Sequence, residues 1–380
     1  MAAPTLALRK HFARLQDPRR RARRRHLLMD ILVIALCAVI AGANSWPEIE
    51  TFGRKRLAWL QRFLELPNGI PSHDTFERVF DRLAPHAFES CFRHWVATLA
   101  TELGWGHIAI DGKTLRGSHC RGKGLGPLHL VSAWADQARL TLGQVAVDEK
   151  SNEITAIPQL LGLLELQGAL VTIDAMGCQK EIAQRIVTGG GDYVLAVKDN
   201  QPNLLEDIQQ ALEKAFDTNY AGIEHDTYVT EERGHGRQEQ RSYVVLYDLD
   251  GIRDRKLWEG LQAIGMCVRE RTANGTTSEE THYFIGSVSS RATTYAAALR
   301  NHWGIENRLH WQLDVSFRED ANRVQKRNGA ENLALLRRLA LALLKRHPGK
   351  GSINTKRYAA ALDTQFLEEV LASAGKLGNG

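Results

Sequence analysis

Five short apolar segments between residues 107 and 197 constrain the fold of this chain more than any other feature. Three follow one another with no helical segment between them, and two more come later, each after a segment with helical spacing. The segments are 108–110, 128–134, 140–147, 169–173 and 193–197. Three consecutive strands form an antiparallel meander, whereas a strand that is reached through a helix runs parallel to its neighbour. The order therefore predicts an α/β fold with a mixed sheet, a three-strand meander followed by two crossover strands, flanked by helices on both faces.

Two of these segments end in an aspartate. Asp111 follows the 108–110 segment in an Asp-Gly pair, and Asp174 follows the 169–173 segment. An Asp-Gly pair after a strand usually marks a hairpin turn, and this interpretation stays open for Asp111 taken alone. If the two strands are neighbours, however, the two carboxylates lie close together, and close carboxylates need a cation between them. Hard oxygen ligands of this kind favour Mg²⁺ or Mn²⁺.

A third group of polar side chains repeats along a predicted helix from about residue 293 to about residue 315. Its members, spaced four residues apart on one side of the helix, are His302, Glu306, His310 and Asp314. A solvent-exposed stripe is the commonest explanation of such a pattern. Trp303 and Trp311 beside the stripe favour a buried setting instead, which makes Glu306 a third candidate carboxylate. A zinc site built from His302, Glu306 and His310 is a further alternative, although the His-Glu-x-x-His arrangement is absent.

Charge is distributed unevenly along the chain. The net charge is +5, but residues 1–26 contain nine Lys or Arg against one acid, Asp17. A basic arm on a slightly acidic body indicates a polyanionic partner, either nucleic acid or an anionic membrane surface. The apolar run Ile31–Ala43 resembles part of a secretory signal, but it is too short to span a bilayer, and we expect a buried helix there.

Composition divides the chain into four parts. They are a basic arm at 1–26, a helical domain at 27–105, a sheet domain at 106–345 and a polar tail at 346–380 with one helix at about 359–374. The helical domain could dock DNA or form a plain bundle. The sheet domain contains a β-rich insertion at about 200–288. Five widely spaced cysteines, an odd number, fit reduced thiols in a cytosolic protein.

The residues around these carboxylates resemble those of insertion-sequence DDE transposases, in particular the H-repeat-associated branch. The matching segments are IAIDGKTLRGS, VTIDAMGCQKEIA, DYVLAVKDNQP and LRNHWGIENRLHWQLDVSFRED. Three earlier segments, HFARLQDPRRRARRRHLLMDIL, NSWPEIETFGRKR and IPSHDTFERVF, resemble the helical domain that precedes the catalytic domain in that branch. The similarity covers roughly residues 8–345.

This resemblance implies an RNase H-like catalytic core and a transposase that cleaves DNA and transfers strands at the ends of an insertion sequence. It assigns Asp111, Asp174 and Glu306 as catalytic residues that bind two Mg²⁺ or Mn²⁺ ions. Expected partners are double-stranded DNA, both terminal inverted repeats and target, and a second copy of the chain in a homodimer on that DNA. The expected location is the bacterial cytoplasm, at the nucleoid when bound, without a membrane.

The chain departs from many relatives around the glutamate. Where those carry Tyr, Arg and Lys, this sequence has Leu299, His302 and Leu313. The residues expected to contact DNA are Lys113, Arg116, Lys198, Asn200, Arg300, His302, Asn307 and Arg308, with Arg23, Arg24 and Arg25 in the arm. His235 and Arg237 in the insertion are weaker candidates for DNA contact.

Three alternatives stay open at this point. Glu319 or Asp320 could replace Glu306 as the third ligand. The protein could also be a domesticated DNA-binding protein or a repressor of transposition that has lost catalysis. A metal nuclease without a joining step would share the same site.

Overall fold

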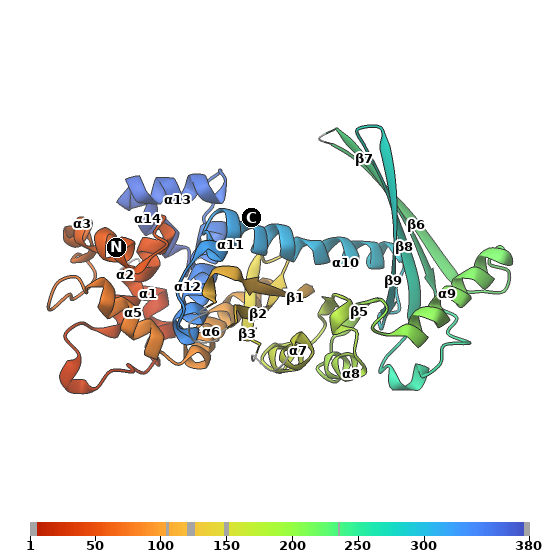
Figure 1. Cartoon of the computed structure of the whole chain (residues 1–380), viewed down its shortest axis with the longest axis horizontal. Coiled ribbons are helices and arrows are strands. Elements are labelled where there is room, and N and C mark those ends of the chain that lie inside the picture. The colour runs from red at the N-terminus through yellow and green to blue at the C-terminus, as the bar shows by residue number, and fades with distance from the viewer. Residues whose placement is uncertain (1–5, 104–105, 120–125, 148–151, 235, 376–380) are drawn as a thin grey trace.

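We describe a computed structural model of the chain, which covers residues 6–103, 106–119, 126–147, 152–234 and 236–375. Its described part is elongated and has three regions (Figure 1). A helical region lies at one end, a sheet covered by helices lies in the middle, and long paired strands project at the other end.

The central sheet has nine strands in the order β3-β2-β1-β4-β5-β9-β8-β7-β6. The first five are β1 (His107–Leu115), β2 (Leu128–Ala135), β3 (Leu140–Ala146), β4 (Leu170–Ile173) and β5 (Asp192–Val197). β1, β2 and β3 pair antiparallel, whereas β4 runs parallel to β1 and β5 runs parallel to β4. The predicted meander followed by two crossover strands, the order of an RNase H-like sheet, is therefore confirmed.

β1 is longer than its apolar run indicates. It pairs with β4 only from His107 to Ile110, but it continues beside β2 as far as Leu115. Asp111 therefore lies inside β1, at the first position beyond the end of β4. The hairpin turn that the Asp-Gly pair suggested is not formed, because β2 supplies hydrogen bonds to the strand past this point.

The β-rich insertion continues the same sheet. Its strands are β6 (His225–Gly234), β7 (Arg237–Leu246), β8 (Ala263–Ala273) and β9 (Thr276–Gly286). β9 joins the central strands by pairing antiparallel with β5. Together the four strands project beyond the helices as a long arm, which we call the β arm (Figure 1). Asn274 and Gly275, both with positive φ, form the turn between β8 and β9. β6 was not predicted.

Helices cover both faces of the sheet. One face is crossed by a rod made of α10 (Ala292–Ile305), a π-helical turn (Glu306–His310) and α11 (Trp311–Val315). The other face carries α7 (Glu153–Leu161) and α8 (Lys180–Thr188), while α9 (Pro202–Asp217) lies beside β8 (Figure 1). The rod confirms the helix predicted from about residue 293 to about residue 315. The π-turn inside it was not predicted, and such turns are frequent at functional sites.

The helical region is built from both ends of the chain. Its amino-terminal helices are α1 (Leu6–Phe12), α2 (Leu28–Ile40), α3 (Trp46–Lys55), α4 (Leu57–Leu60), α5 (His73–Arg82) and α6 (Pro85–Leu103). Residues 31–40 of α2 are all buried, so the apolar run forms a core helix as predicted. No helix in the described ranges combines the length and the apolar character needed to cross a bilayer.

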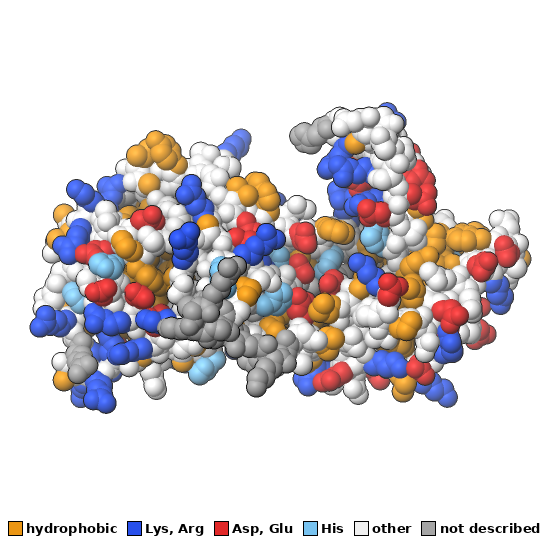
Figure 2. Space-filling view, in the orientation of Figure 1, with side chains coloured by type: hydrophobic (Ala, Val, Ile, Leu, Met, Phe, Trp, Pro, Cys, Tyr) orange, Lys and Arg blue, Asp and Glu red, His pale blue; other side chains and the backbone are white. Residues whose placement is uncertain are grey.

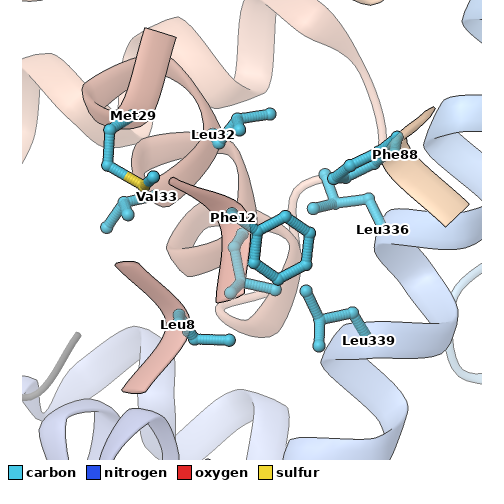
Figure 3. A pocket seen from close by; sticks show the side chains of 9 residues that line it. Leu8, Phe12, Met29, Leu32, Val33, Phe88, Leu336 and Leu339 are labelled. Carbon is cyan, nitrogen blue, oxygen red and sulfur yellow. The ribbon is translucent and has the colours of Figure 1, made fainter. Parts of the chain in front are cut away.

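A long helix near the carboxyl end, α12 (Arg327–Arg346), packs against α2, α5 and α6. Leu336 and Leu339 of α12 line an apolar pocket together with Leu8 and Phe12 of α1 (Figure 3). The predicted basic arm thus contains a helix that is anchored in the core.

The predicted polar tail folds into two helices instead of one. These are α13 (Ile353–Leu362) and α14 (Thr364–Ala372), and Asp363 between them accepts a hydrogen bond of 2.8 Å from the backbone of Gln365. Leu367, Val370 and Leu371 are fully buried. Four cysteines are free and buried, and Cys120 lies outside the described residues.

Candidate active site

Asp111 and Asp174 occupy the same edge of the sheet. The last paired positions of β1 and β4 are Ile110 and Ile173, and each aspartate is the next residue of its strand. Asp174 Oδ1 accepts hydrogen bonds from the backbone of Met176 at 3.1 Å and of Gly177 at 3.4 Å. The short turn after β4 therefore fixes this carboxylate at the strand end.

The surroundings of Asp111 and Asp174 provide little positive charge to compensate the two carboxylates. Burial, and then the charges of Asp174, Glu306 and Glu153, raise the pKa of Asp111 to about 7, against a hydrogen bond from Gly112. Burial and the Glu153 charge also raise the pKa of Asp174. Mutual repulsion of this kind is relieved by a cation.

The donor set suits a divalent metal by charge and by ligand type, since all four groups are carboxylates. Among the described residues, however, no three His, Cys, Asp or Glu side chains lie close enough together to hold a metal ion. The fit is therefore one of ligand chemistry and charge and does not extend to coordination geometry.

The π-turn places two members of the polar stripe near Asp111. Glu306 is its first residue and is exposed. His310 is its last residue, and its Nδ1 lies 3.4 Å from Asp111 Oδ2. Burial and the nearby Arg338, Lys113 and His129 lower the pKa of His310 to about 3, so this imidazole is neutral and can orient the carboxylate.

His302 faces the sheet as well. Its Nδ1 lies 3.0 Å from Thr172 Oγ1, which also contacts His107 Nε2 at 2.9 Å. Burial and the neighbouring His107 lower the pKa of His302 to about 4. The prediction of a solvent-exposed stripe is therefore wrong for His302 and His310. Each histidine contacts a different protein group, and the two do not share a zinc site.

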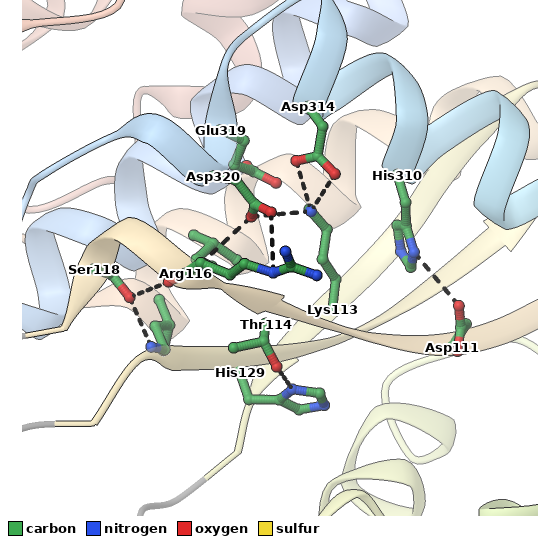
Figure 4. A network of polar contacts seen from close by, with 12 residues as sticks. Asp111, Lys113, Thr114, Arg116, Ser118, His129, His310, Asp314, Glu319 and Asp320 are labelled. Atoms are coloured by element: carbon green, nitrogen blue, oxygen red, sulfur yellow. Dashed lines mark hydrogen bonds and ion pairs between the residues drawn. The ribbon is translucent and has the colours of Figure 1, made fainter.

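Lys113 lies on the same face of β1 as Asp111 and forms a buried clamp. Its Nζ is 2.7 Å from both oxygens of Asp314 and 3.3 Å from Asp320 Oδ1, and the residue is only 7% exposed (Figure 4). We call Lys113, Asp314 and Asp320 the β1 clamp. It holds α11, and with it the π-turn, against β1. In this geometry the Lys113 ammonium faces two carboxylates instead of solvent.

The two alternatives to Glu306 as the third ligand, Glu319 and Asp320, are both paired with basic side chains. Asp320 belongs to the β1 clamp and also lies 3.6 Å from Arg116 Nε. Glu319 and Arg338 form an ion pair of 3.2 Å in which neither side chain is exposed. Of Glu306, Glu319 and Asp320, it is Glu306 whose charge is among the causes that raise the pKa of Asp111.

The remaining residues expected at DNA fall into two groups. Lys198 is exposed near Asp174, and Arg116 is 85% exposed. The others already contact the protein, through the pairs Asn200–Ala175, Arg300–Glu232, Asn307–Trp303 and Arg308–Asp136.

The arginines of the amino-terminal arm lie beside a basic groove. Arg24 pairs with Asp17 at 3.6 Å, Arg25 is exposed, and the Arg23 side chain lies outside the described residues, as does His235 of the β arm. The groove is lined by Arg19, Arg25, His26, Arg54, Ile70, Ser72, Thr75, Arg78, Val79 and Arg82. We call it the arginine groove. No acid belongs to this described lining.

Glu153 was not singled out in the sequence beyond its place at a helix start. It is the first residue of α7 and contributes charge to both aspartates. The sequence did contain a signal for Glu153. It is an acid at the start of the helix that precedes the fourth strand, and such a residue can face the sheet edge where that strand ends.

Known proteins are similar to this chain over most of its length. Residues 104–343 match the family model described as "Transposase DDE domain", and residues 9–96 match "DDE_Tnp_1-associated". "Putative transposase YncI" of Escherichia coli O157:H7 is 42% identical over 370 residues, which cover 96% of this chain and 94% of that protein. "H repeat-associated putative transposase YhhI" of Escherichia coli K12 is 39% identical over 375 residues, covering 97% of this chain and 98% of that protein.

Two further relatives differ in character. "Inactive transposase YbfQ" of Escherichia coli K12 is 43% identical over 72 residues, which cover 19% of this chain and 86% of that protein. Among solved structures, the piggyBac transposase synaptic complex with hairpin DNA matches with a TM-score of 0.45 at 12% identity, covering 97% of this chain and 81% of that chain.

Proposed function

Because the chain belongs to the family of transposases with a DDE domain, we propose that it cleaves DNA at the ends of an insertion sequence and transfers the cut strands. The observation that carries the proposal is that Asp111 and Asp174 directly follow the last paired positions, Ile110 and Ile173, of the neighbouring strands β1 and β4. Asp111 from β1, Asp174 from the end of β4 and Glu306 from the π-turn are close enough for the last two to raise the pKa of the first.

In this proposal Asp111, Asp174 and Glu306 hold divalent ions, Mg²⁺ or Mn²⁺. Two such ions, when bound, supply Lewis acidity at the attacking and leaving oxygens of the phosphodiester. The chain's own contribution is placement. Asp174 is fixed by the turn after β4, His310 orients Asp111, and the β1 clamp keeps the π-turn over the strand.

DNA binding is supported by the distribution of positive charge. Lys198, whose charge acts on Asp174, and Arg116, which lies near Asp320, are both exposed and suit phosphate contacts. The arginine groove in the helical region offers a second phosphate surface, in which Arg25, Arg78 and Arg82 have no carboxylate partner among the described residues. We expect these contacts to add affinity that falls steeply with salt, because phosphate neutralisation releases counterions. Pairing two element ends would use two copies of the chain.

A strand-transfer assay tests the proposal. The full chain is incubated with Mg²⁺ and DNA that carries the element's terminal inverted repeats, and cleaved and joined products are separated on a gel. We expect Asp111→Ala to abolish both products while end binding, followed by gel shift, is retained. Asp217→Ala, at an exposed position at the end of α9, is the matched control and should keep both.

The outcomes separate the alternatives. Binding of ends by the unmodified chain without any product would support a DNA-binding protein that has lost catalysis. Cleavage without joining would support a nuclease. Equal activity of Asp111→Ala and the unmodified chain would contradict the assignment of the site.

A further inference from the structure

A carboxylate in the turn between β2 and β3 is fixed to the sheet beneath the rod. Asp136 directly follows β2, and its side chain is only 8% exposed. Its backbone N–H donates to the carbonyl of His107, the first residue of β1, at 3.4 Å. Trp134 Nε1 donates to Asp136 Oδ1 at 3.2 Å. Both the backbone and the side chain of Asp136 are therefore held by the sheet.

The rod meets this carboxylate two residues before and two residues after Glu306. Arg308, inside the π-turn, donates through Nη1 to both oxygens of Asp136, at 2.8 and 2.7 Å. A Cβ atom added to Gly304 would lie only 2.6 Å from Asp136 Oδ1. Because Trp134 and Arg308 fix that oxygen, a methyl group at 304 would displace the carboxylate or the helix. Glycine allows this close approach.

Two other side chains bond to the backbone of the rod at the π-turn. Lys345 of α12 donates to the carbonyl of Arg308, and its Nζ lies 4.2 Å from the centre of the Trp134 ring. Asn307 Nδ2 donates to the carbonyl of Trp303 at 3.2 Å. Side chains that bond to backbone groups are a recognised cause of irregularity in a helix. The π-turn is thus joined to both β2 and α12.

Glu306 itself has no such contact. It is exposed, and its carboxylate makes no hydrogen bond or ion pair with any residue that the structure describes. The place of this carboxylate is therefore set through its backbone, by the contacts that hold the π-turn. A functional group keeps its geometry only when the element that carries it is locked by packing and by hydrogen bonds.

We propose that Asp136 is a positioning residue for Glu306, because it pairs with Arg308 and lies against Gly304 and so holds the π-turn in place. The inference rests on the proposed function, in which Glu306 is the third carboxylate. It also gives Arg308 a role within the protein, in place of the expected contact with DNA.

The test is strand transfer by the full chain in a single turnover, with Mg²⁺ and saturating DNA that carries the element's terminal inverted repeats. Asp136→Asn keeps the shape of the side chain but removes the charge that holds Arg308. We expect the rate to fall by about tenfold to a hundredfold, because a misplacement of about 1 Å can cost this much. DNA affinity, followed by gel shift, should stay unchanged.

Amide hydrogen exchange reports on the π-turn without any activity. Asp136→Asn should speed exchange in residues 306–310, because local opening depends on local contacts, and should leave exchange in α8 unchanged. Gly304→Ala keeps every charged group and should slow strand transfer as Asp136→Asn does. Alanine favours a helix more than glycine, so a weaker helix would not explain that loss.

Asp207→Asn is the matched control. Asp207 on α9 is 4% exposed and accepts a hydrogen bond of 2.6 Å from Arg253 Nε, so it is a buried carboxylate paired with an arginine outside the rod. Its variant should lower the unfolding temperature as Asp136→Asn does. It should keep the strand-transfer rate and the exchange of residues 306–310.

The outcomes distinguish this inference from the proposed function. If Asp136→Asn reacts as fast as the unmodified chain, or slows no more than Asp207→Asn, the inference is overturned and the proposed function stands. Slowing that saturating DNA restores would place Arg308 in DNA binding and would overturn the inference too. If the unmodified chain forms no product, the proposed function fails, and unchanged exchange in residues 306–310 would then overturn the inference independently.

Discussion

Glu306 and Glu319, two candidates for the third carboxylate, lie in opposite electrostatic settings. Glu306 is exposed at the start of the π-turn, whereas Glu319 is fully buried against Arg338. We expect Glu306→Gln to abolish strand transfer with a stability change within about 0.5 kcal/mol, as for surface substitutions. Glu319→Gln should lower the free energy of unfolding by about 3–5 kcal/mol, because the Arg338 charge stays buried without its partner.

Urea unfolding and strand transfer, measured on the same preparations, check this pair. The opposite result would be an inactive Glu319→Gln variant of full stability together with an active Glu306→Gln variant. In that case Glu319 would be the third carboxylate and Glu306 would not.

Lys345 provides a pH-dependent test away from the carboxylates. Its Nζ lies 4.2 Å from the centre of the Trp134 ring and donates a hydrogen bond to the backbone of Arg308. Burial, with Arg139 and Arg308 nearby, lowers the pKa of Lys345 from 10.5 to about 7. Between these two values the unfolded chain binds more protons than the folded chain, so stability rises with pH.

Lys345→Met removes this titration. The stability of the unmodified chain relative to Lys345→Met should therefore increase from about pH 7 to about pH 10.5, as measured by urea unfolding across that range. Lys350→Met, at an exposed position after α12, is the control and should give a constant difference. If the free energies of unfolding of Lys345→Met and of the unmodified chain changed in parallel with pH, the Lys345 amine would have an ordinary pKa.

At the residue scale, much of the candidate site was accessible from the sequence. The strand order and the polar stripe brought Asp111, Asp174 and Glu306 into one hypothesis, and in the structure the charges of Asp174 and Glu306 both raise the pKa of Asp111. The contacts of His310 and Glu153 were not accessible, because they depend on how far β1 runs past β4 and on which face each helix covers. Those are properties of tertiary packing.

The β1 clamp is an element-scale device, and it competes with the expectation that Lys113 contacts phosphate. If Lys113 mainly joins β1 to α11, Lys113→Met should cost about 1–3 kcal/mol of stability, because it leaves partly buried carboxylates without their partner. The slope of log affinity for DNA against log salt should then stay unchanged.

Lys198→Met is the matched comparison, since Lys198 is exposed beside the same site. It should leave stability unchanged and reduce the salt slope by about 0.9, the value for one phosphate contact. Fluorescence anisotropy at several salt concentrations gives the slope, and urea unfolding gives the stability. A reduced slope with Lys113→Met at full stability would restore Lys113 as a phosphate contact.

The β arm shows why element prediction failed in one region. Near its base, Tyr243 and Cys267 pack on Ala296 of α10, so one face carries an apolar signal. Towards the tip both faces are polar. Arg241 lies opposite Arg269 in the strand register on one face. On the other face Glu270 lies opposite Glu279. Figure 2 shows basic side chains on the side of the arm towards α10 and acidic ones on the outer side. A strand such as β6, without an apolar face, has no alternation to detect.

At the scale of the whole molecule, the two ends of the chain form one helical body. Residues 27–105 and the region after 345 were expected as separate parts, because composition changes at both boundaries. The structure joins them through contacts that span most of the sequence. Trp95 Nε1 donates to the carbonyl of Ala374 at 2.9 Å, and Arg357 Nη2 donates to the carbonyl of Val39 at 2.9 Å. Contacts this distant in sequence leave no local pattern.

This arrangement predicts that the carboxyl-terminal helices are required for the stability of the amino-terminal ones. A chain that ends at Lys350 lacks α13 and α14, including the buried Leu367, Val370 and Leu371. Each buried side chain of this size contributes about 1.5–3 kcal/mol, so the loss is comparable with the whole stability of an ordinary domain. We expect the truncated chain to unfold at a much lower temperature, with rapid proteolysis within residues 27–105.

The control is a chain that ends at residue 375, which keeps both helices and should melt as the full chain does. An unchanged melting temperature of the chain that ends at Lys350 would show that the amino-terminal helices and α12 suffice, and the tail would then be an accessory layer. A reduced temperature would mean that DNA docking by the arginine groove depends on both ends of the chain, since Arg54, Arg78 and Arg82 lie on helices of this same body.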